Sequence, residues 1–395
     1  MEIEYKNARS MSPSQKQINT LLKCYEKGQI AQAEKLSLSI TQEFPQHAFG
    51  WKVLGVIYGM TGKYEQAVKV NQTAVLLSPQ DAVAHNNLAN TLQVLGRFKD
   101  AKASYEKAIL IDPYLSEAYS NLGVTYKELG RLEDSITCFD KAISLKPNFV
   151  EALNGLGITF QTIGKSEKAE LNFLKAVKLK PDFVDAFWNL HGIQMSLNRA
   201  EYYIDECLKV AKNHIQARII KAALRYYQGE KYSFNILEKS NLKKHPYMRS
   251  YAWVFSLPNL PELYFNRWHF FDAIIKKSIV SKPFYEFGVW RASSFKYLIK
   301  FFKKGYGFDT FEGFQSISKK DNKSLKESDF SDTSFNVLKD WSSLHSQNRA
   351  VSHIDKQQLI KGDATKTIPK FVKENPYLII ALLYLDFDIY EPTKV

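Results

Sequence analysis

Residues 116–149 decide the fold of the N-terminal half, and they read SEAYSNLGVTYKELGRLEDSITCFDKAISLKPNF. Apolar and small residues recur in this stretch at helical spacing, namely Tyr119, Leu122, Gly123, Tyr126, Phe139 and Ala142, and Pro147 follows them. Such spacing places side chains on one face of a helix, and proline ends a helix because it has no amide hydrogen to donate. The stretch therefore predicts two packed helices, and the small Gly123 allows their close approach.

The same pattern returns along the chain at a constant interval, as the prolines show at Pro45, Pro79, Pro113, Pro147 and Pro181. The expected first helices carry matching strings, Trp51-x-x-Leu54-Gly55-x-x-Tyr58, Leu88-Ala89-x-x-Leu92 and Leu153-x-x-Leu156-Gly157-x-x-Phe160. A single helix pair cannot bury its apolar face alone, so repeated pairs stack on one another.

This period and pattern resemble the tetratricopeptide repeat family, whose repeats are about 34 residues long. The resemblance covers residues 14–217 and about six repeats, of which 14–47 and 184–217 are degenerate. It implies an α-solenoid whose end repeats are atypical because their outer faces meet water or another domain.

Polar residues of the first helices are expected to line the concave face of such an array. Asparagines recur there, at Asn86, Asn87, Asn90, Asn121 and Asn154. They resemble the asparagine ladder that clamps a peptide backbone in the repeat arrays of O-linked N-acetylglucosamine transferases, where amide side chains both donate and accept hydrogen bonds. We expect a protein or peptide partner, bound by Asn87, Asn90, Asn121 and Asn154. The alternative is a solvated helix surface.

Residues 218–280 lose the period and are expected to form a helical, aromatic connector. Residues 243–261 are rich in aromatic residues and interrupted by prolines, and residues 265–279 are expected to form an amphipathic helix. Trp268 and Phe271 on that helix are candidates for the wall of a cofactor pocket or for ordinary core packing.

Residues 281–395 begin with an apolar strand, FYEFG at 284–288, and a second strand is expected to end at Asp309. A helix between two such strands would make the opening of a nucleotide-binding βαβ unit. Gly288 leaves room for a ligand beside the backbone, and Glu286 or Asp309 could accept hydrogen bonds from ribose hydroxyls.

Two further acidic segments follow expected strands. Gly362 and Asp363 come after a third strand, and an alternative role for Asp363 is capping the next helix. Asp386 and Asp388 follow the apolar strand 378–385. Two carboxylates one residue apart can share a divalent cation or divide the roles of metal ligand and base.

Three blocks occur in order, EFGVWR at 286–291, GFDTFEG at 307–313 and LYLDFDIYEPTK at 383–394. Together they resemble the class I S-adenosylmethionine-dependent methyltransferases and, within them, the macrocin O-methyltransferase (TylF-like) group. The resemblance implies a partial α/β Rossmann-like three-layer domain over 281–395. S-adenosyl-L-methionine would be held by Glu286, Gly288, Asp309 and Asp363. Mg²⁺ would bind Asp386, and Asp388 would remove the proton of a small-molecule hydroxyl acceptor on a sugar or secondary metabolite.

The resemblance stops at Val395, before the later strands of such a sheet, so we expect a truncated domain with impaired activity. The strand at 378–385 would then be an exposed edge that favours self-association. Two alternatives remain: a non-catalytic tetratricopeptide scaffold, or a glycosyltransferase-associated repeat protein, suggested by the repeats and the Asp-x-Asp motif.

The composition of the 395 residues favours a folded chain, with 45% hydrophobic residues and three widely spaced cysteines that predict free thiols. The net charge is +13, but the basic residues are dispersed, so no nucleic-acid partner is expected. We also expect no membrane association, because the most apolar run is far too short to span a bilayer, and a cytoplasmic location.

Overall fold

The computed structural model describes residues 12–265, 267–278, 280, 284–287, 298, 301–302, 305–309, 357–361, 364–374 and 382–385. The chain divides after Leu190 into two units, which are described separately.

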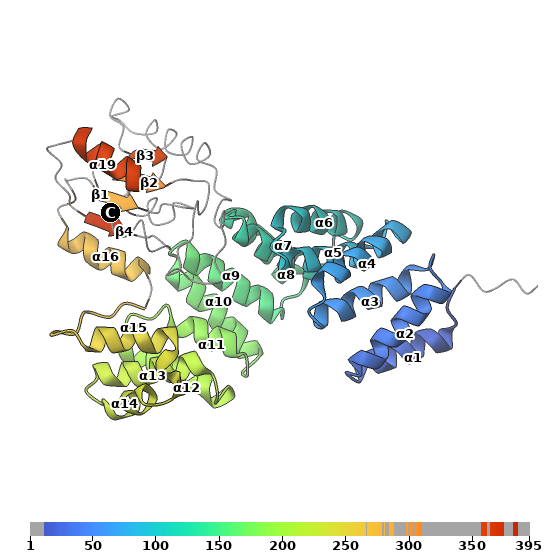
Figure 1. The fold of residues 1–395 in the computed structure, drawn as a ribbon, viewed down its shortest axis with the longest axis horizontal. Coiled ribbons are helices and arrows are strands. Elements are labelled where there is room, and N and C mark those ends of the chain that lie inside the picture. The colour runs from blue at the N-terminus through green and yellow to red at the C-terminus, as the bar shows by residue number, and fades with distance from the viewer. Residues whose placement is uncertain are drawn as a thin grey trace, which may run out of the picture. The chain divides into compact units, whose positions relative to one another are not determined.

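The first unit is a series of antiparallel helix pairs (Figure 1). The helices are α1 (Gln15–Glu26), α2 (Ile30–Glu43), α3 (Ala48–Met60), α4 (Tyr64–Leu77), α5 (Ala82–Val94), α6 (Phe98–Ile111), α7 (Ser116–Glu128), α8 (Leu132–Leu145), α9 (Val150–Thr162), α10 (Ser166–Leu179) and α11 (Val184–His191). The helical solenoid expected from the regular spacing of the prolines is therefore confirmed.

A glycine closes the first helix of each of the first five pairs. Gly130 after α7 has a φ of 73°, and its equivalents have φ between 69° and 78°, at Gly28, Gly62, Gly96 and Gly164. At this turn the amide of Arg131 donates to the carbonyl of Tyr126 over 2.8 Å, which satisfies a carbonyl that the helix end would leave open. The left-handed φ explains the choice of glycine, since a Cβ is disfavoured there.

Aromatic residues of the second helices fill the space between neighbouring pairs. Phe139 on α8 is fully buried, and a Cβ added at Gly155 on α9 would lie 2.5 Å from its ring. The ring also lies against Gly123 on α7, where an added Cβ would be 3.1 Å away. Phe139 therefore packs against two first helices at once, which is the role expected of the small and aromatic positions.

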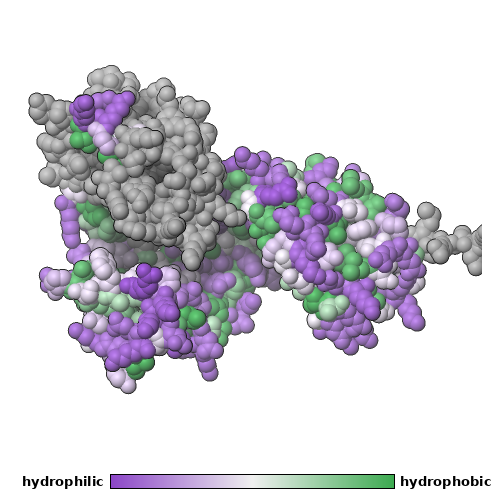
Figure 2. Space-filling view, in the orientation of Figure 1, coloured by the Kyte–Doolittle hydropathy of each residue, from purple (hydrophilic) through white to green (hydrophobic). Residues whose placement is uncertain are grey.

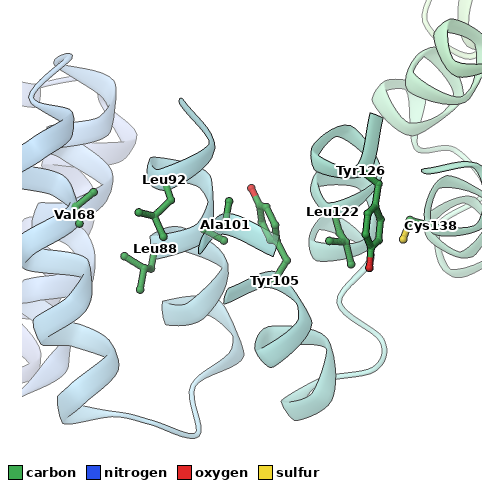
Figure 3. Packing of buried hydrophobic residues seen from close by; sticks show 9 residues of the cluster. Val68, Leu88, Leu92, Ala101, Tyr105, Leu122, Tyr126 and Cys138 are labelled. Carbon is green, nitrogen blue, oxygen red and sulfur yellow. The ribbon is translucent and has the colours of Figure 1, made fainter. Parts of the chain in front are cut away.

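One cluster of buried residues extends across neighbouring helix pairs. Figure 3 shows one cluster that runs from Val68 on α4 through Leu88 and Leu92 on α5 to Tyr126 on α7 and Cys138 on α8. The three cysteines are buried free thiols, as the sequence predicted. Burial, with smaller contributions from nearby carboxylates, raises the pKa of the Cys138 thiol to about 12, so this thiol is protonated at neutral pH.

The second unit contains helices α12 (Leu197–Val210), α13 (Ile215–Tyr227), α14 (Tyr232–Glu238), α15 (Pro246–Phe255), α16 (Arg267–Lys277) and α19 (Ala364–Glu374), and a short 3₁₀ helix η1 (Asn241–Lys244). Helices α13 to α15 share a core of aromatic rings, in which Phe255 stacks on Tyr226 with centroids 3.8 Å apart and meets Phe234 edge-on at 4.8 Å. The aromatic connector expected over 243–261 thus includes a helix with its own core.

Four short parallel strands complete the described part of this unit, β1 (Phe284–Phe287), β2 (Gly305–Asp309), β3 (Gln357–Lys361) and β4 (Leu382–Leu385). Their order is β3-β2-β1-β4, so β4 is an edge strand among those described. The expected strand 378–385 is described only from Leu382 onward. The Rossmann-like assignment of residues 281–395 stays a prediction.

Across these described ranges, no helix is long and apolar enough to cross a membrane. On the face shown in Figure 2, hydrophilic residues cover much of the described surface, and hydrophobic residues form small separate patches.

Candidate functional site

The first helices of the repeats build a common face, because α3 lies beside α5, α5 beside α7, and α7 beside α9. Three of the asparagines that the sequence predicted for this face occupy equivalent or adjacent helix positions. Asn87 and Asn121 are one repeat period apart, and Asn154 directly precedes the next position of that series. All three are half-buried, so their side chains are partly accessible.

A hydrogen bond joins two of these asparagines across neighbouring repeats. The Nδ2 of Asn121 on α7 donates to Oδ1 of Asn90 on α5 over 2.9 Å. The buried Tyr105 hydroxyl lies 2.6 Å from the same Oδ1 and 2.7 Å from Oε1 of Gln93, and it donates its single proton to one of them at a time. Burial raises the pKa of Tyr105, so the hydroxyl stays protonated and holds Asn90 in place.

A second bond of the same kind lies farther along the array. The Nδ2 of Asn189 on α11 donates to Oδ1 of Asn154 on α9 over 2.9 Å. Within the described residues, the remaining amide atoms, Nδ2 of Asn90 and Asn154 and Oδ1 of Asn121 and Asn189, have no hydrogen bond inside the chain. Each asparagine pair therefore presents one donor group and one acceptor.

Gly155 occupies the position at which α5, α7 and α11 carry Asn87, Asn121 and Asn189. The ring of Phe139 explains the interruption, because any side chain at residue 155 would collide with it. Asn154, one residue earlier, supplies the amide that bonds to α11 instead. The row of asparagines is thus displaced by one residue at α9 and is not lost.

Asn86 and Asn87 differ although they are adjacent. Asn86 is only 8% exposed, and its Oδ1 has no partner among the described residues, so the expectation that it lines an accessible face was wrong. Asn87 remains half-buried, and its carbonyl accepts hydrogen bonds from Nδ2 of the buried Asn71 and from the hydroxyl of Thr91. Their positions in the helical sequence pattern do not predict that Asn86 is buried and Asn87 is partly accessible.

Acidic residues stand at the second position of three consecutive first helices, namely Glu117, Glu151 and Asp185, and all are exposed. Carboxylates at helix N-termini interact favourably with the helix dipole, which accounts for their recurrence. Partial burial acts to raise the pKa of Glu117, but hydrogen bonds from Lys146 and others outweigh it, and the pKa lies below its ordinary value. Glu117 is therefore a carboxylate at neutral pH, paired with the ammonium group of Lys146.

The second candidate site is the carboxyl edge of the sheet, where the register aligns the strand ends. Phe287 of β1 pairs with Phe308 of β2 on one side and with Leu385 of β4 on the other. Phe308 pairs in turn with Ile360 of β3, and Asp309 with Lys361. Asp309 ends β2 at this edge, whereas Glu286 precedes the last residue of β1.

The other predicted site residues, Gly288, Asp363, Asp386 and Asp388, lie outside the described residues. No group of three or more His, Cys, Asp or Glu side chains that could hold a metal occurs in the described part of the chain. The predicted roles of these residues therefore remain predictions. Trp268 and Phe271 are 5% and 0% exposed and meet edge-on, which is core packing.

The sequence did not predict two residues that take part in the asparagine hydrogen bonds, Asn189 and Tyr105. Asn189 lies two repeat periods after Asn121, so the period alone could have identified it. Tyr105 is buried in the core, and its hydroxyl also orients Asn90. No sequence pattern distinguishes this polar role from its apolar one.

Comparison with known proteins identifies the repeats. Residues 82–115 and 116–149 match one tetratricopeptide repeat family, and residues 150–183 match a second family of the same description. No curated protein sequence matches the chain.

Several solved structures are similar to part of the chain. MamA from Desulfovibrio magneticus RS-1 is 22% identical, with 42% of this chain and 94% of that chain covered and a TM-score of 0.39. YrrB, described as a tetratricopeptide protein with an unusual peptide-binding site, is 20% identical over 46% of this chain and 95% of its own, with a TM-score of 0.37. PilF of Pseudomonas aeruginosa is 19% identical over 52% and 96%, with a TM-score of 0.47. Residues 82–183 of this protein are three consecutive tetratricopeptide repeats.

Proposed function

We propose that the repeat array binds an extended peptide segment of a partner protein along the face built by α3, α5, α7, α9 and α11. The observation that carries the proposal is the pair of asparagine–asparagine hydrogen bonds, Asn121 to Asn90 and Asn189 to Asn154. Each pair fixes its amide planes and leaves one donor group and one acceptor without a partner in the described chain. A peptide unit in extended conformation offers one acceptor and one donor, which matches this arrangement.

The asparagine pairs favour recognition of the peptide backbone over any particular side chain. Because each amide is already held by a neighbouring repeat, little side-chain entropy is lost when it binds a ligand. The array thereby acts as a protein-interaction scaffold, which is the non-catalytic alternative expected from the sequence.

The test is selection of binders from a random dodecapeptide display library against the full chain, followed by affinity measurements with the selected peptides. We expect Asn121→Ala and Asn154→Ala each to weaken binding by about three- to tenfold, the usual net value of one hydrogen bond. Asn148→Ala changes an exposed asparagine in the turn after α8 and is the matched control. Equal affinities for all four proteins would contradict the proposal, provided that circular dichroism shows the variants to be folded.

We propose as a second function that residues 281–395 bind S-adenosyl-L-methionine for methyl transfer to a hydroxyl group. The strand order β3-β2-β1-β4 supports it, because the ends of β1 and β2 are aligned, and Gly288 follows the first in sequence while Asp309 ends the second. Ligands of open parallel sheets bind at such a carboxyl edge. When bound, the cofactor supplies the methyl group, while Asp309 and Asp363 would hold its ribose and adenine, and Asp388 would accept the proton of the acceptor, with Mg²⁺ at Asp386.

Calorimetric titration with S-adenosylhomocysteine tests this second function without requiring turnover. We expect binding by the parent chain, loss of binding in Asp309→Ala, and unchanged binding in Asp182→Ala, an exposed acid of the array. Titration with a uridine diphosphate sugar in the presence of Mn²⁺ distinguishes the glycosyltransferase alternative. Absence of binding to either ligand by a folded sample would leave the scaffold function alone.

A further inference from the structure

The second unit contains a pocket that neither proposed function uses. It lies between the end of α13, α15, residues 261–265 and α16, and it has a volume of about 400 Å³. Five aromatic side chains line it, Tyr227, Tyr251, Tyr264, Phe265 and Phe270. Glu262 is the one charged residue among those that line it, all of which are described. None of the lining residues is a lysine or arginine.

The chemistry of this lining favours positive charge. Hydrogen bonds from the Tyr264 hydroxyl and from Nζ of Lys277, the latter 3.1 Å from Oε2, lower the pKa of Glu262 below its ordinary value. Glu262 is therefore a carboxylate at neutral pH. The faces of aromatic rings carry partial negative charge, and a cation above them is attracted.

The phenol groups of the pocket remain neutral hydrogen-bonding groups. Burial, more than the nearby tyrosines, raises the pKa of Tyr251 to about 12. A neutral phenol carries no formal charge, so its attraction for a cation comes from the face of its ring.

Two lysines of the second unit contact an aromatic ring or Glu262. Nζ of Lys231 lies over the ring of Tyr226, 5.2 Å from the ring centroid. A comparable contact occurs in the array, where Nζ of Lys63 lies 5.1 Å from the centroid of the Tyr58 ring. Nζ of Lys277 lies 3.2 Å from Oε1 and 3.1 Å from Oε2 of Glu262, and both side chains are largely exposed, so solvent screens this ion pair. Neither lysine lines the pocket, so its aromatic walls are left for a cation from outside the chain.

We propose that this pocket binds an alkylammonium group, held by the tyrosine and phenylalanine rings and by the carboxylate of Glu262. The same chemistry is found in a free quaternary amine such as choline and in an alkylated lysine side chain of a protein. This assignment is independent of peptide binding by the array and of cofactor binding at the sheet.

The test is titration of the full chain, followed by nuclear magnetic resonance, with choline and with its uncharged isostere 3,3-dimethylbutan-1-ol. We expect choline to bind at least about fivefold tighter than the isostere, since the two differ in charge and hardly in shape. N-acetyl-trimethyllysine methylamide is the third probe. Tighter binding of this probe than of choline assigns the pocket to a protein side chain, and the reverse assigns it to a free amine.

Three variants separate the pocket from nonspecific binding. Glu262→Gln removes the charge at an exposed side chain and is expected to reduce the preference for choline over the isostere, and Phe270→Leu removes one aromatic wall and is expected to weaken choline binding by about three- to fivefold. Tyr232→Leu is the control, because Tyr232 is 73% exposed and lies outside the pocket. Equal binding of choline and the isostere, no binding of either, or an equal loss in Tyr232→Leu would overturn the proposal.

Discussion

The repeat array and the helices α13 to α15 both bury aromatic rings between helices, but they distribute the burial differently. In three consecutive repeats of the array, one fully buried ring occupies the same position, at Tyr105, Phe139 and Phe173. In α13 to α15, the rings of Tyr226, Phe234, Tyr251 and Phe255 converge on one cluster with no period.

The free energy of unfolding depends on packing differently in the two regions. Every repeat contacts only its neighbours, so the stability of the array is close to a sum of similar interface energies. The aromatic cluster instead connects three helices through shared rings, so removal of one ring affects all three. Substitutions in the two regions test this contrast, and those that remove buried rings should matter most.

Phe139→Ala removes a ring that packs against Gly123 and Gly155 on two helices, and we expect a loss of about 3–5 kcal/mol in the free energy of unfolding. Hydrogen exchange should show lost protection centred on α7 to α9, whereas Phe234→Ala should expose α13 to α15 together. Urea unfolding followed by circular dichroism measures the magnitude.

Tyr114→Ala is the control for this comparison, because Tyr114 is 79% exposed, and its effect should stay within about 0.5 kcal/mol. Uniform loss of protection over the whole chain in Phe139→Ala would show that the array does not behave as a nearest-neighbour system.

The same substitution at two glycines of the array should have opposite signs. Gly155→Ala brings a Cβ to 2.5 Å from the Phe139 ring, so we expect destabilisation by about 1–3 kcal/mol. Gly59→Ala lies within α3, where an added Cβ meets no described atom within 4 Å, and we expect stabilisation by up to about 1 kcal/mol because alanine restricts the unfolded chain. Thermal unfolding of both variants provides the comparison. Two shifts of the same sign would mean that packing against Phe139 does not determine the choice of glycine.

The array was predictable from sequence because the same residue types recur at equivalent positions of successive repeats. The spacing of Leu122, Gly123 and Phe139 returns in the next repeat as Leu156, Gly157 and Phe173, so one repeat confirms another. The helix pairs and the aromatic positions followed directly. Asn87, Asn90, Asn121 and Asn154 are half-buried, and their role in peptide binding stays a prediction. The burial of Asn86 depends on neighbouring helices that no single helix pattern contains.

The second unit gave fewer such signals. The helix over 265–279 and the strand at 284–288 could be recognised from local pattern, and the structure has α16 at Arg267–Lys277 and β1 at Phe284–Phe287. The alkylammonium pocket could not, since its walls come from α13, α15, α16 and the segment before α16. Tyr227 and Phe270 are far apart along the chain, and nothing in their local sequence brings them together.

Charged contacts should contribute least, and they too should differ between the two regions. Asp81 caps α5 through the amide of Ala84 at 3.1 Å and pairs with Nζ of Lys52 at 2.6 Å, whereas the Glu262–Lys277 pair of the second unit is largely exposed. We expect Asp81→Ala to cost about 1 kcal/mol through the lost cap and Asp81→Asn, which keeps an acceptor, no more than about 0.5 kcal/mol. Glu262→Gln should cause no measurable change in stability.

The pH dependence of the stability of Asp81→Asn, compared with the parent chain, measures the contribution of the Asp81 charge. Partial burial acts to raise the pKa of Asp81, but the hydrogen bonds from Lys52 and from the Ala84 amide outweigh it, so the pKa in the folded protein lies below the ordinary value of 3.8. A lowered pKa means that the folded state favours the carboxylate, so its stabilisation is complete above pH 3.8 and is lost as the pH falls through the folded pKa. The stability difference between the parent chain and Asp81→Asn should therefore be constant near neutral pH and disappear in acid. A difference that persists unchanged in acid would assign the effect of Asp81 to its cap and not to its pairing with Lys52.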